Sequence, residues 1–140
     1  LKFVGGPAYS LAAFWRVMVL KTYPLSFEID GKNLEQDALF IEISNTRYTG
    51  RSFLMAPAAR ADDGLLDVTV VQRLPRYRLL RLFPTIYRGR HVEHPEVFAC
   101  QGRSVRIDAP DGLLLAPDGE LRGCTPATIT CLHRDLEIFA

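Results

Sequence analysis

Turn signals at short intervals are the feature that most restricts how this chain can fold. Among the chain's Asp-Gly pairs, those at residues 30–31, 63–64 and 118–119 favour tight turns because Gly readily takes a positive φ. Between the turns, short runs alternate apolar and polar residues, which is typical of half-buried strands. The predicted strands are residues 25–30, 38–43, 51–55, 65–71, 97–100, 104–108, 113–115, 127–132 and 135–139. This arrangement predicts a mainly β fold, a two-sheet β-sandwich with two decorating helices.

Both predicted helices can be interpreted in two ways. Residues 8–20 carry large apolar side chains at three- and four-residue spacings, which favours a core-packing helix over one that faces a lipid or a partner. Residues 75–89 interleave arginines with Leu, Phe and Tyr, bend at Pro84 and end at Gly89. This second helix either lies on an anionic membrane surface or caps the sheet with its arginines in solvent.

The composition predicts one ordinary domain over residues 1–140. The net charge of +1 gives no strong attraction to nucleic acid, and no apolar run approaches the roughly 20 residues of a membrane span. Three cysteines without a Cys-x-x-Cys pair fit a reduced, cytoplasmic setting. The first residues lack the layout of a signal peptide. Because the chain does not begin with Met, we expect it to be part of a longer protein.

Three polar stretches are the candidates for chemistry. Asp62 and Asp63 precede Gly64, and their carboxylates with nearby turn carbonyls either seat a hard cation or form an ordinary acidic turn. Residues 118–120 read Asp-Gly-Glu, which by itself is most simply a hairpin turn. The polar loop of residues 44–50 holds Asn45, which either serves function or caps a turn. These residues alone do not decide between the alternatives.

A fourth stretch, His91 to Pro95, holds two histidines three residues apart. Its His-x-Glu start is shared with zinc deaminases, but the Pro-Cys-x-x-Cys that such a site requires is missing. No cysteine pair completes a zinc site either, so we do not expect a metal here.

The order and wording of these stretches carry a resemblance. Residues 56–68 read AP-x-A-x-x-DDGLLDV, and they resemble the C-terminal domain of the diacylglycerol kinase-like lipid kinases, a group that includes bacterial diacylglycerol kinases and relatives of sphingosine and ceramide kinases. The opening Gly-Gly-Pro-Ala-Tyr, Asn45 with Gly50, the passage from Gly89 to Pro95, and the late Asp-Gly-Glu are similar to family motifs in the same order. The resemblance covers nearly the whole chain.

The resemblance implies a division of roles among the site residues. A structural magnesium would bind the carboxylate of Asp63 and the carbonyls of Leu65 and Arg60, with waters completing its shell. Glu120 would be the general base that takes a proton from a lipid hydroxyl as it attacks the γ-phosphate of ATP. Asp118 would orient Glu120 or help to hold the catalytic metal. Asn45 and Gly50 would belong to the substrate loop.

The family pattern is incomplete in this chain. The kinases bind ATP mainly through glycine-rich loops of a separate N-terminal domain, and no GGDGT-like block is present here. The chain therefore resembles the lipid-side half of an ATP- and Mg²⁺-dependent kinase, with diacylglycerol as the likeliest acceptor, and by itself it should be inactive. Arg51 departs from the small residue that often follows Gly50 in relatives, which puts the shape of this loop in question.

Partners and location follow from the same resemblance. We expect an N-terminal kinase domain and a lipid substrate at the membrane surface, with a peripheral place on the cytoplasmic side of the inner membrane. We expect no nucleic acid partner, and the resemblance allows a homodimer. Two other functions stay open: a NAD-kinase-like small-molecule kinase domain, and a non-catalytic membrane-associated β-sandwich binding module.

Overall fold

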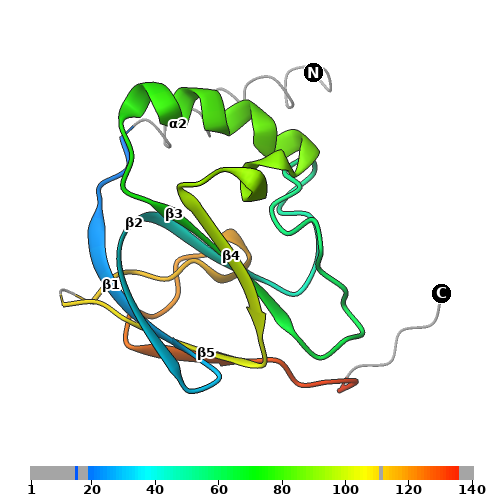
Figure 1. Ribbon diagram of the computed structural model, residues 1–140. Helices are drawn as coiled ribbons and strands as arrows, with labels where there is room; N and C mark the ends of the chain where they lie inside the picture. Colours follow the sequence, from blue (N-terminus) through cyan, green and yellow to red (C-terminus); the bar gives the residue numbers. More distant parts are fainter. Residues whose placement is uncertain (1–14, 16–18, 111, 136–140) are drawn as a thin grey trace.

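Six antiparallel strands build the body of the molecule. The computed structural model describes residues 15, 19–110 and 112–135. Within them the sheet has the order β4-β3-β2-β1-β5-β6 (Figure 1). The strands are β1 (Tyr23–Ile29), β2 (Lys32–Ser44), β3 (Leu66–Gln72), β4 (Val97–Gly102), β5 (Ser104–Asp108) and β6 (Ala127–Thr130). The prediction of a mainly β sandwich-type domain is confirmed, and its described strands are hydrogen-bonded into one continuous sheet.

Helical turns lie in the connections between strands. The helix predicted at residues 75–89 is present as α2 (Arg76–Leu82), which continues into the 3-10 helix η1 (Phe83–Arg88). The change of helix type coincides with Pro84, which has no N–H to donate. Two short 3-10 helices follow, η2 (Arg90–Glu93) and η3 (Pro117–Gly119). No described helix is long and apolar enough to cross a membrane. Most of the helix predicted at residues 8–20 lies outside the described residues.

Apolar side chains pack on both faces of the central strand β3. Every residue from Leu66 to Val71 is buried. Alternate residues of β3 join Phe27 of β1 in the larger core, whereas Val71 on the other face packs with Leu79 and Leu82 of α2. Because strand side chains alternate between faces, Asp67 and Thr69 must lie on the same face as Val71. The sheet therefore holds two polar residues beneath its covering loops.

The β1–β2 hairpin confirms one predicted turn and extends one strand. Asp30 and Gly31 both have positive φ, 48° and 83°, as a two-residue hairpin turn demands. Strand β2 begins six residues before its predicted start, because its polar first half pairs with β1 from Ile29↔Lys32 to Tyr23↔Ala38. Pairing with a neighbouring strand thus outweighs a sequence without strand character.

Two predicted strands are wrong. Residues 51–55 form only an isolated bridge between Thr49 and Phe53, because the N–H of Leu54 donates instead to the carbonyl of Ile86 in η1 (3.2 Å). Residues 113–115 likewise form only a bridge, between Leu114 and Cys124. The strand predicted at 135–139 lies outside the described residues, except for its first residue.

Candidate functional site

The loop of residues 45–65 joins β2 to β3 and carries the first group of predicted site residues. Glu42, near the end of β2, accepts hydrogen bonds through Oε1 from the hydroxyls of Ser44 (3.1 Å) and Thr49. Gly50 follows with φ of 61° and is exposed, as is Asn45. The loop is thus braced at its base by Glu42, a residue that sequence reasoning missed because its role depends on a hydroxyl seven positions away.

The turn at Asp63 is held by its own carboxylate. Asp63 Oδ1 accepts a hydrogen bond from the N–H of Leu65 (2.9 Å), and the N–H of Asp63 points to the carbonyl of Arg60 (3.5 Å). Gly64 takes φ of 73°. The adjacent Asp62 is exposed and pairs with the side chain of Arg60 (3.4 Å). The two neighbouring acids therefore differ: Asp62 faces solvent, and Asp63 is half-buried within the turn.

A second carboxylate lies behind this turn. Asp67 is 8% exposed, and its two carboxylate oxygens accept hydrogen bonds from Nε2 of Gln101 on β4 at 3.3 and 3.2 Å. Burial raises the pKa of the Asp67 carboxyl, and the charge of Asp63 raises it further. Sequence reasoning did not single out Asp67, although a carboxylate inside an apolar strand was a usable signal.

The donors at this turn fit magnesium. Carboxylate and carbonyl oxygens are what the ion prefers, and it keeps several of its waters. The charge of Asp63 disfavours ionisation of Asp67, and a bound cation would relieve that repulsion. Among the described residues no group of three His, Cys, Asp or Glu side chains could hold a metal, so an ion here would depend on backbone carbonyls and water as well.

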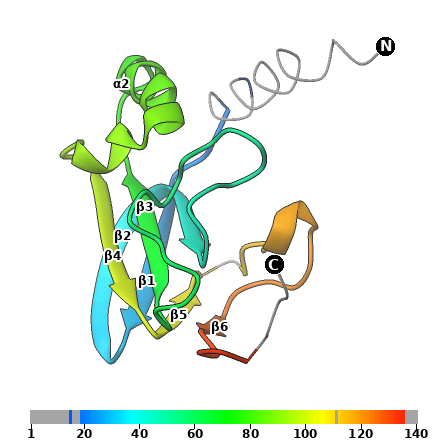
Figure 2. The ribbon, with the colours of Figure 1, turned by 90° about the vertical axis from the view of Figure 1, so that its right-hand side faces the viewer.

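The loop between β5 and β6 carries Asp118 and Glu120. Backbone hydrogen bonds close it, from Arg122 N–H to the Leu115 carbonyl (2.9 Å) and from Thr125 N–H to the Leu113 carbonyl (2.8 Å). Asp118 has φ of 51°, in the left-handed region. Glu120 is exposed, and its Oε2 lies 2.6 Å from Nη2 of Arg122. Figure 2 shows the η3 segment, in orange, standing beside the sheet. The loop thus presents Glu120 to solvent with an arginine as its partner.

Asp63 and Glu120 make their hydrogen bonds and ion pairs within two separate loops. Within the described part of the chain, no hydrogen bond or ion pair joins Asp63 to Asp118 or Glu120. Asn45 and Gly64 instead approach residues 131–133. Asn45 Oδ1 lies 3.9 Å from Cys131 Sγ, and a Cβ on Gly64 would stand 2.8 Å from Nδ1 of His133. The segment after β6 therefore packs against both the substrate-loop candidate and the Asp63 turn.

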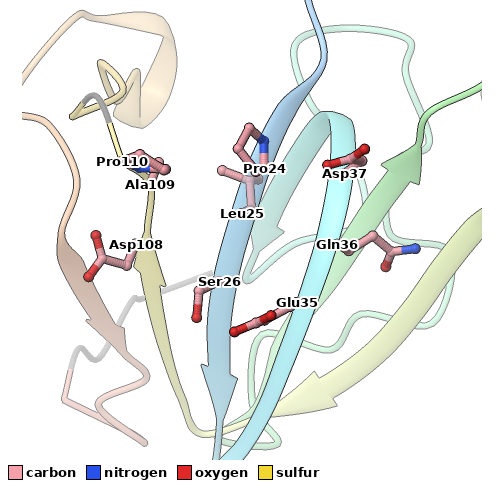
Figure 3. A pocket seen from close by; sticks show the side chains of 9 residues that line it. All are labelled: Pro24, Leu25, Ser26, Glu35, Gln36, Asp37, Asp108, Ala109 and Pro110. Carbon is pink, nitrogen blue, oxygen red and sulfur yellow. The ribbon is translucent and has the colours of Figure 1, made fainter.

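Sequence reasoning also missed a hollow on the outer face of the sheet (Figure 3). It has a volume of about 600 Å³, and no predicted site residue lines it. Ser26 of β1 pairs with Glu35 on one side and with Asp108 on the other, which places both carboxylates on one face beside Asp37. The hollow is acidic and open.

Comparison with known proteins identifies the family of this domain. Over residues 2–140 the chain matches the family described as the YegS C-terminal NAD kinase beta sandwich-like domain. The chain belongs to this family. The resemblance to diacylglycerol kinase-like proteins, inferred from residues 56–68 and 118–120, is thereby confirmed. This YegS-type domain has its acidic turns at Asp63 and Asp118 on loops rather than on strands.

Relatives of this YegS-type domain are named diacylglycerol kinases. One from Mycobacterium tuberculosis is 34% identical over 136 residues, which is 96% of this chain and 44% of the relative. One from Staphylococcus aureus is 29% identical over 141 residues, 100% of this chain and 45% of the relative. A crystal structure of a diacylglycerol kinase from Bacillus anthracis superposes with a TM-score of 0.70 at 25% identity, covering 92% of this chain and 44% of that one. The chain spans less than half the length of these relatives.

Proposed function

We propose that this chain is the lipid-side domain of an ATP- and Mg²⁺-dependent lipid kinase, with the hydroxyl of diacylglycerol as the acceptor. The names of its relatives support the reaction class. In this proposal an N-terminal domain outside the chain supplies the main ATP site, and the chain works peripherally at the cytoplasmic face of the inner membrane. This domain supplies the carboxylates and the lipid-side surface.

The observation that carries the proposal is the presentation of Glu120. A general base must reach the proton that it abstracts, and Glu120 is exposed on a loop that backbone hydrogen bonds hold closed. Its Oε2 lies 2.6 Å from Nη2 of Arg122, so the carboxylate is paired with a guanidinium on the same loop. Glu120 thus takes the proton of the lipid hydroxyl, and Asp118, two residues earlier, orients Glu120 or helps to hold a catalytic metal.

The remaining residues position these parts. Asp63 would hold a structural magnesium together with the carbonyls of Arg60 and Leu65, and Asn45 and Gly50 would shape the loop beside the substrate. When bound, ATP supplies the γ-phosphoryl group, and magnesium neutralises charge on the phosphates. Phosphoryl transfer depends mostly on such positioning and charge neutralisation, which suits a domain whose acidic residues stand on braced loops.

The test is a kinase assay on the full-length protein that contains this chain. Glu120→Gln should lower kcat on diacylglycerol by about 100-fold or more, because general base catalysis contributes roughly 10²–10⁴-fold. Glu28→Gln, an exposed glutamate on β1, is the matched control and should stay active. Circular dichroism should show an intact fold, since an exposed ion pair adds little stability. Full activity of Glu120→Gln would refute the base assignment.

A second candidate follows from the family's own description, which names NAD kinase. A NAD-kinase-like domain would place a polar dinucleotide, rather than a lipid, before Glu120. Adding NAD, sphingosine and ceramide to the assay distinguishes the two. Transfer to NAD alone would select this candidate, and transfer to none of the acceptors would favour a non-catalytic binding module.

A further inference from the structure

A band of arginines lies along α2 and η1. Six of the chain's 17 basic residues fall between positions 73 and 90, and that segment holds no Asp or Glu. The rest of the chain is left with eleven Lys and Arg against all 16 acidic residues. The near-neutral total therefore conceals a strongly basic segment on an otherwise acidic domain. Such asymmetry orients a protein on a charged surface.

Core packing fixes which side of this segment faces outward. Leu79 and Leu82 are buried against the second core cluster, at 5% and 2% exposure. Tyr77, Leu80 and Arg81 are exposed and stand at i, i+3 and i+4, which puts them on one face of α2. Tyr77 is 56% exposed and Leu80 39%. The outward face therefore combines a positive charge with an aromatic and an aliphatic side chain.

Several of the arginines are available to an external partner. Arg78 is paired with Glu96, and Arg90 with Glu93. Arg73, Arg81 and Arg88 are exposed, and none of them makes an ion pair with any described residue. Arg76 makes no ion pair with a described residue either, but its side chain donates to the Leu20 carbonyl, which leaves Arg73, Arg81 and Arg88 as the more available charges. Figure 1 shows α2 at one end of the molecule, above β2 and β3.

We propose that a basic surface docks onto an anionic phospholipid bilayer; it is defined by the exposed residues Arg73 before α2, Tyr77, Leu80 and Arg81 on α2, and Arg88 at the end of η1. Arginines are attracted to anionic headgroups, and exposed tyrosine and leucine enter the interfacial region between headgroups and acyl chains. Exposed apolar side chains and an acidic remainder of the chain favour a bilayer over nucleic acid. The inference rests on the proposed function, because a kinase for a membrane lipid must meet its substrate at a bilayer.

The test combines vesicle binding with two forms of substrate, in the full-length protein. The docking variant is Arg73→Gln, Arg81→Gln and Arg88→Gln together. The control variant is Lys32→Gln, Arg103→Gln and Arg106→Gln, which removes the same charge from exposed positions at the far hairpin and β5. Binding is measured by sedimentation with phosphatidylcholine vesicles with and without phosphatidylglycerol. Activity is measured on diacylglycerol in these vesicles and on a water-soluble short-chain diacylglycerol.

The docking variant should lose roughly 100-fold in affinity for the anionic vesicles at about 0.1 M salt, because each arginine near an anionic surface contributes about fivefold. It should lose activity on vesicle diacylglycerol and keep activity on the short-chain substrate. The control variant should keep both. Equal binding by the two variants, or binding by the wild type that does not depend on phosphatidylglycerol, would overturn the inference. If no substrate is phosphorylated, the proposed function fails, whereas the vesicle measurement still decides the docking face.

Discussion

The fully buried histidine of η2 gives the sharpest stability prediction. His91 is 1% exposed, and its Nε2 lies 3.0 Å from the backbone carbonyl of Met55. A carbonyl can only accept, so Nε2 carries the proton. Burial lowers the pKa of His91, with the bond to Met55 opposing part of that effect. The histidine is therefore held neutral, and it anchors the loop segment that leads into the Asp63 turn.

Replacing His91 with Ala should destabilise the domain by about 4 kcal/mol. Truncation of a buried side chain of similar size costs about 2–5 kcal/mol, and the lost hydrogen bond adds about 1 kcal/mol. In a domain of this size that corresponds to a fall of roughly 15 °C in the midpoint of thermal unfolding. His94→Ala is the matched control, because His94 is partly exposed and pairs with Glu96 near the surface. Its cost should stay below about 1 kcal/mol.

The pH dependence tests the same reasoning independently. The unfolded chain protonates this histidine near pH 6.5, whereas folded His91 resists protonation. The contribution of His91 to the free energy of unfolding should therefore be fully present above about pH 6.5. Below that pH the free energy of unfolding should fall by up to about 1.4 kcal/mol per pH unit. His91→Gln retains an N–H donor and should remove this slope. Calorimetry from pH 5 to pH 8 measures both effects. An unchanged slope in His91→Gln, or a cost equal to that of His94→Ala, would refute the account.

Two further predictions concern glycine packing and the metal. In denaturant unfolding, Gly89→Ala should lower the free energy of unfolding by about 1–3 kcal/mol more than Gly31→Ala does. Both glycines have positive φ, so the backbone strain is shared. A Cβ at Gly89 would stand 2.6 Å from Pro57 Cγ, whereas nothing lies within 4 Å of a Cβ at Gly31. Equal losses of stability in the two variants would show that the loop around Pro57 moves aside to accept the added methyl group. Saturating Mg²⁺ should raise the thermal midpoint, corresponding to about 2.7 kcal/mol at one hundred times Kd, and Asp63→Asn but not Asp62→Asn should abolish the rise. A rise that survives in Asp63→Asn would place the ion elsewhere.

Local chemistry made much of the fold predictable. The Asp30-Gly31 turn and strand β3 follow from residues that interact with near neighbours. The first half of β2 could not be predicted, because its polar residues become a strand only through pairing with β1. Residues 51–55 look like a strand, but the backbone of Leu54 bonds to η1 instead. Each failure occurs where a contact distant in sequence decides the local structure.

The site divides in the same way. Asp63 and Glu120 stand in turns that the sequence marks and that near neighbours hold, whereas the buried residues Asp67 and His91 bond to distant parts of the chain. Gln101 reaches Asp67 across 34 positions, and His91 reaches Met55 across 36. Such partners leave no local signal, so sequence reasoning named Asp63 and Glu120 and missed the contacts of Asp67 and His91.

The contacts between η1, η2 and the β2–β3 loop connect the docking face to the proposed metal turn. Leu54 N–H donates to Ile86, Gly89 is packed against Pro57, and His91 holds the carbonyl just before Ala56. Three contacts within four consecutive loop residues leave this part of the loop little freedom to move without the helical segment. A surface that orients α2 and η1 would therefore also orient residues 54–57, the part of the β2–β3 loop that precedes Asp63. Under the docking proposal, a bilayer would orient these loop residues in this way, although the docking arginines lie outside the site.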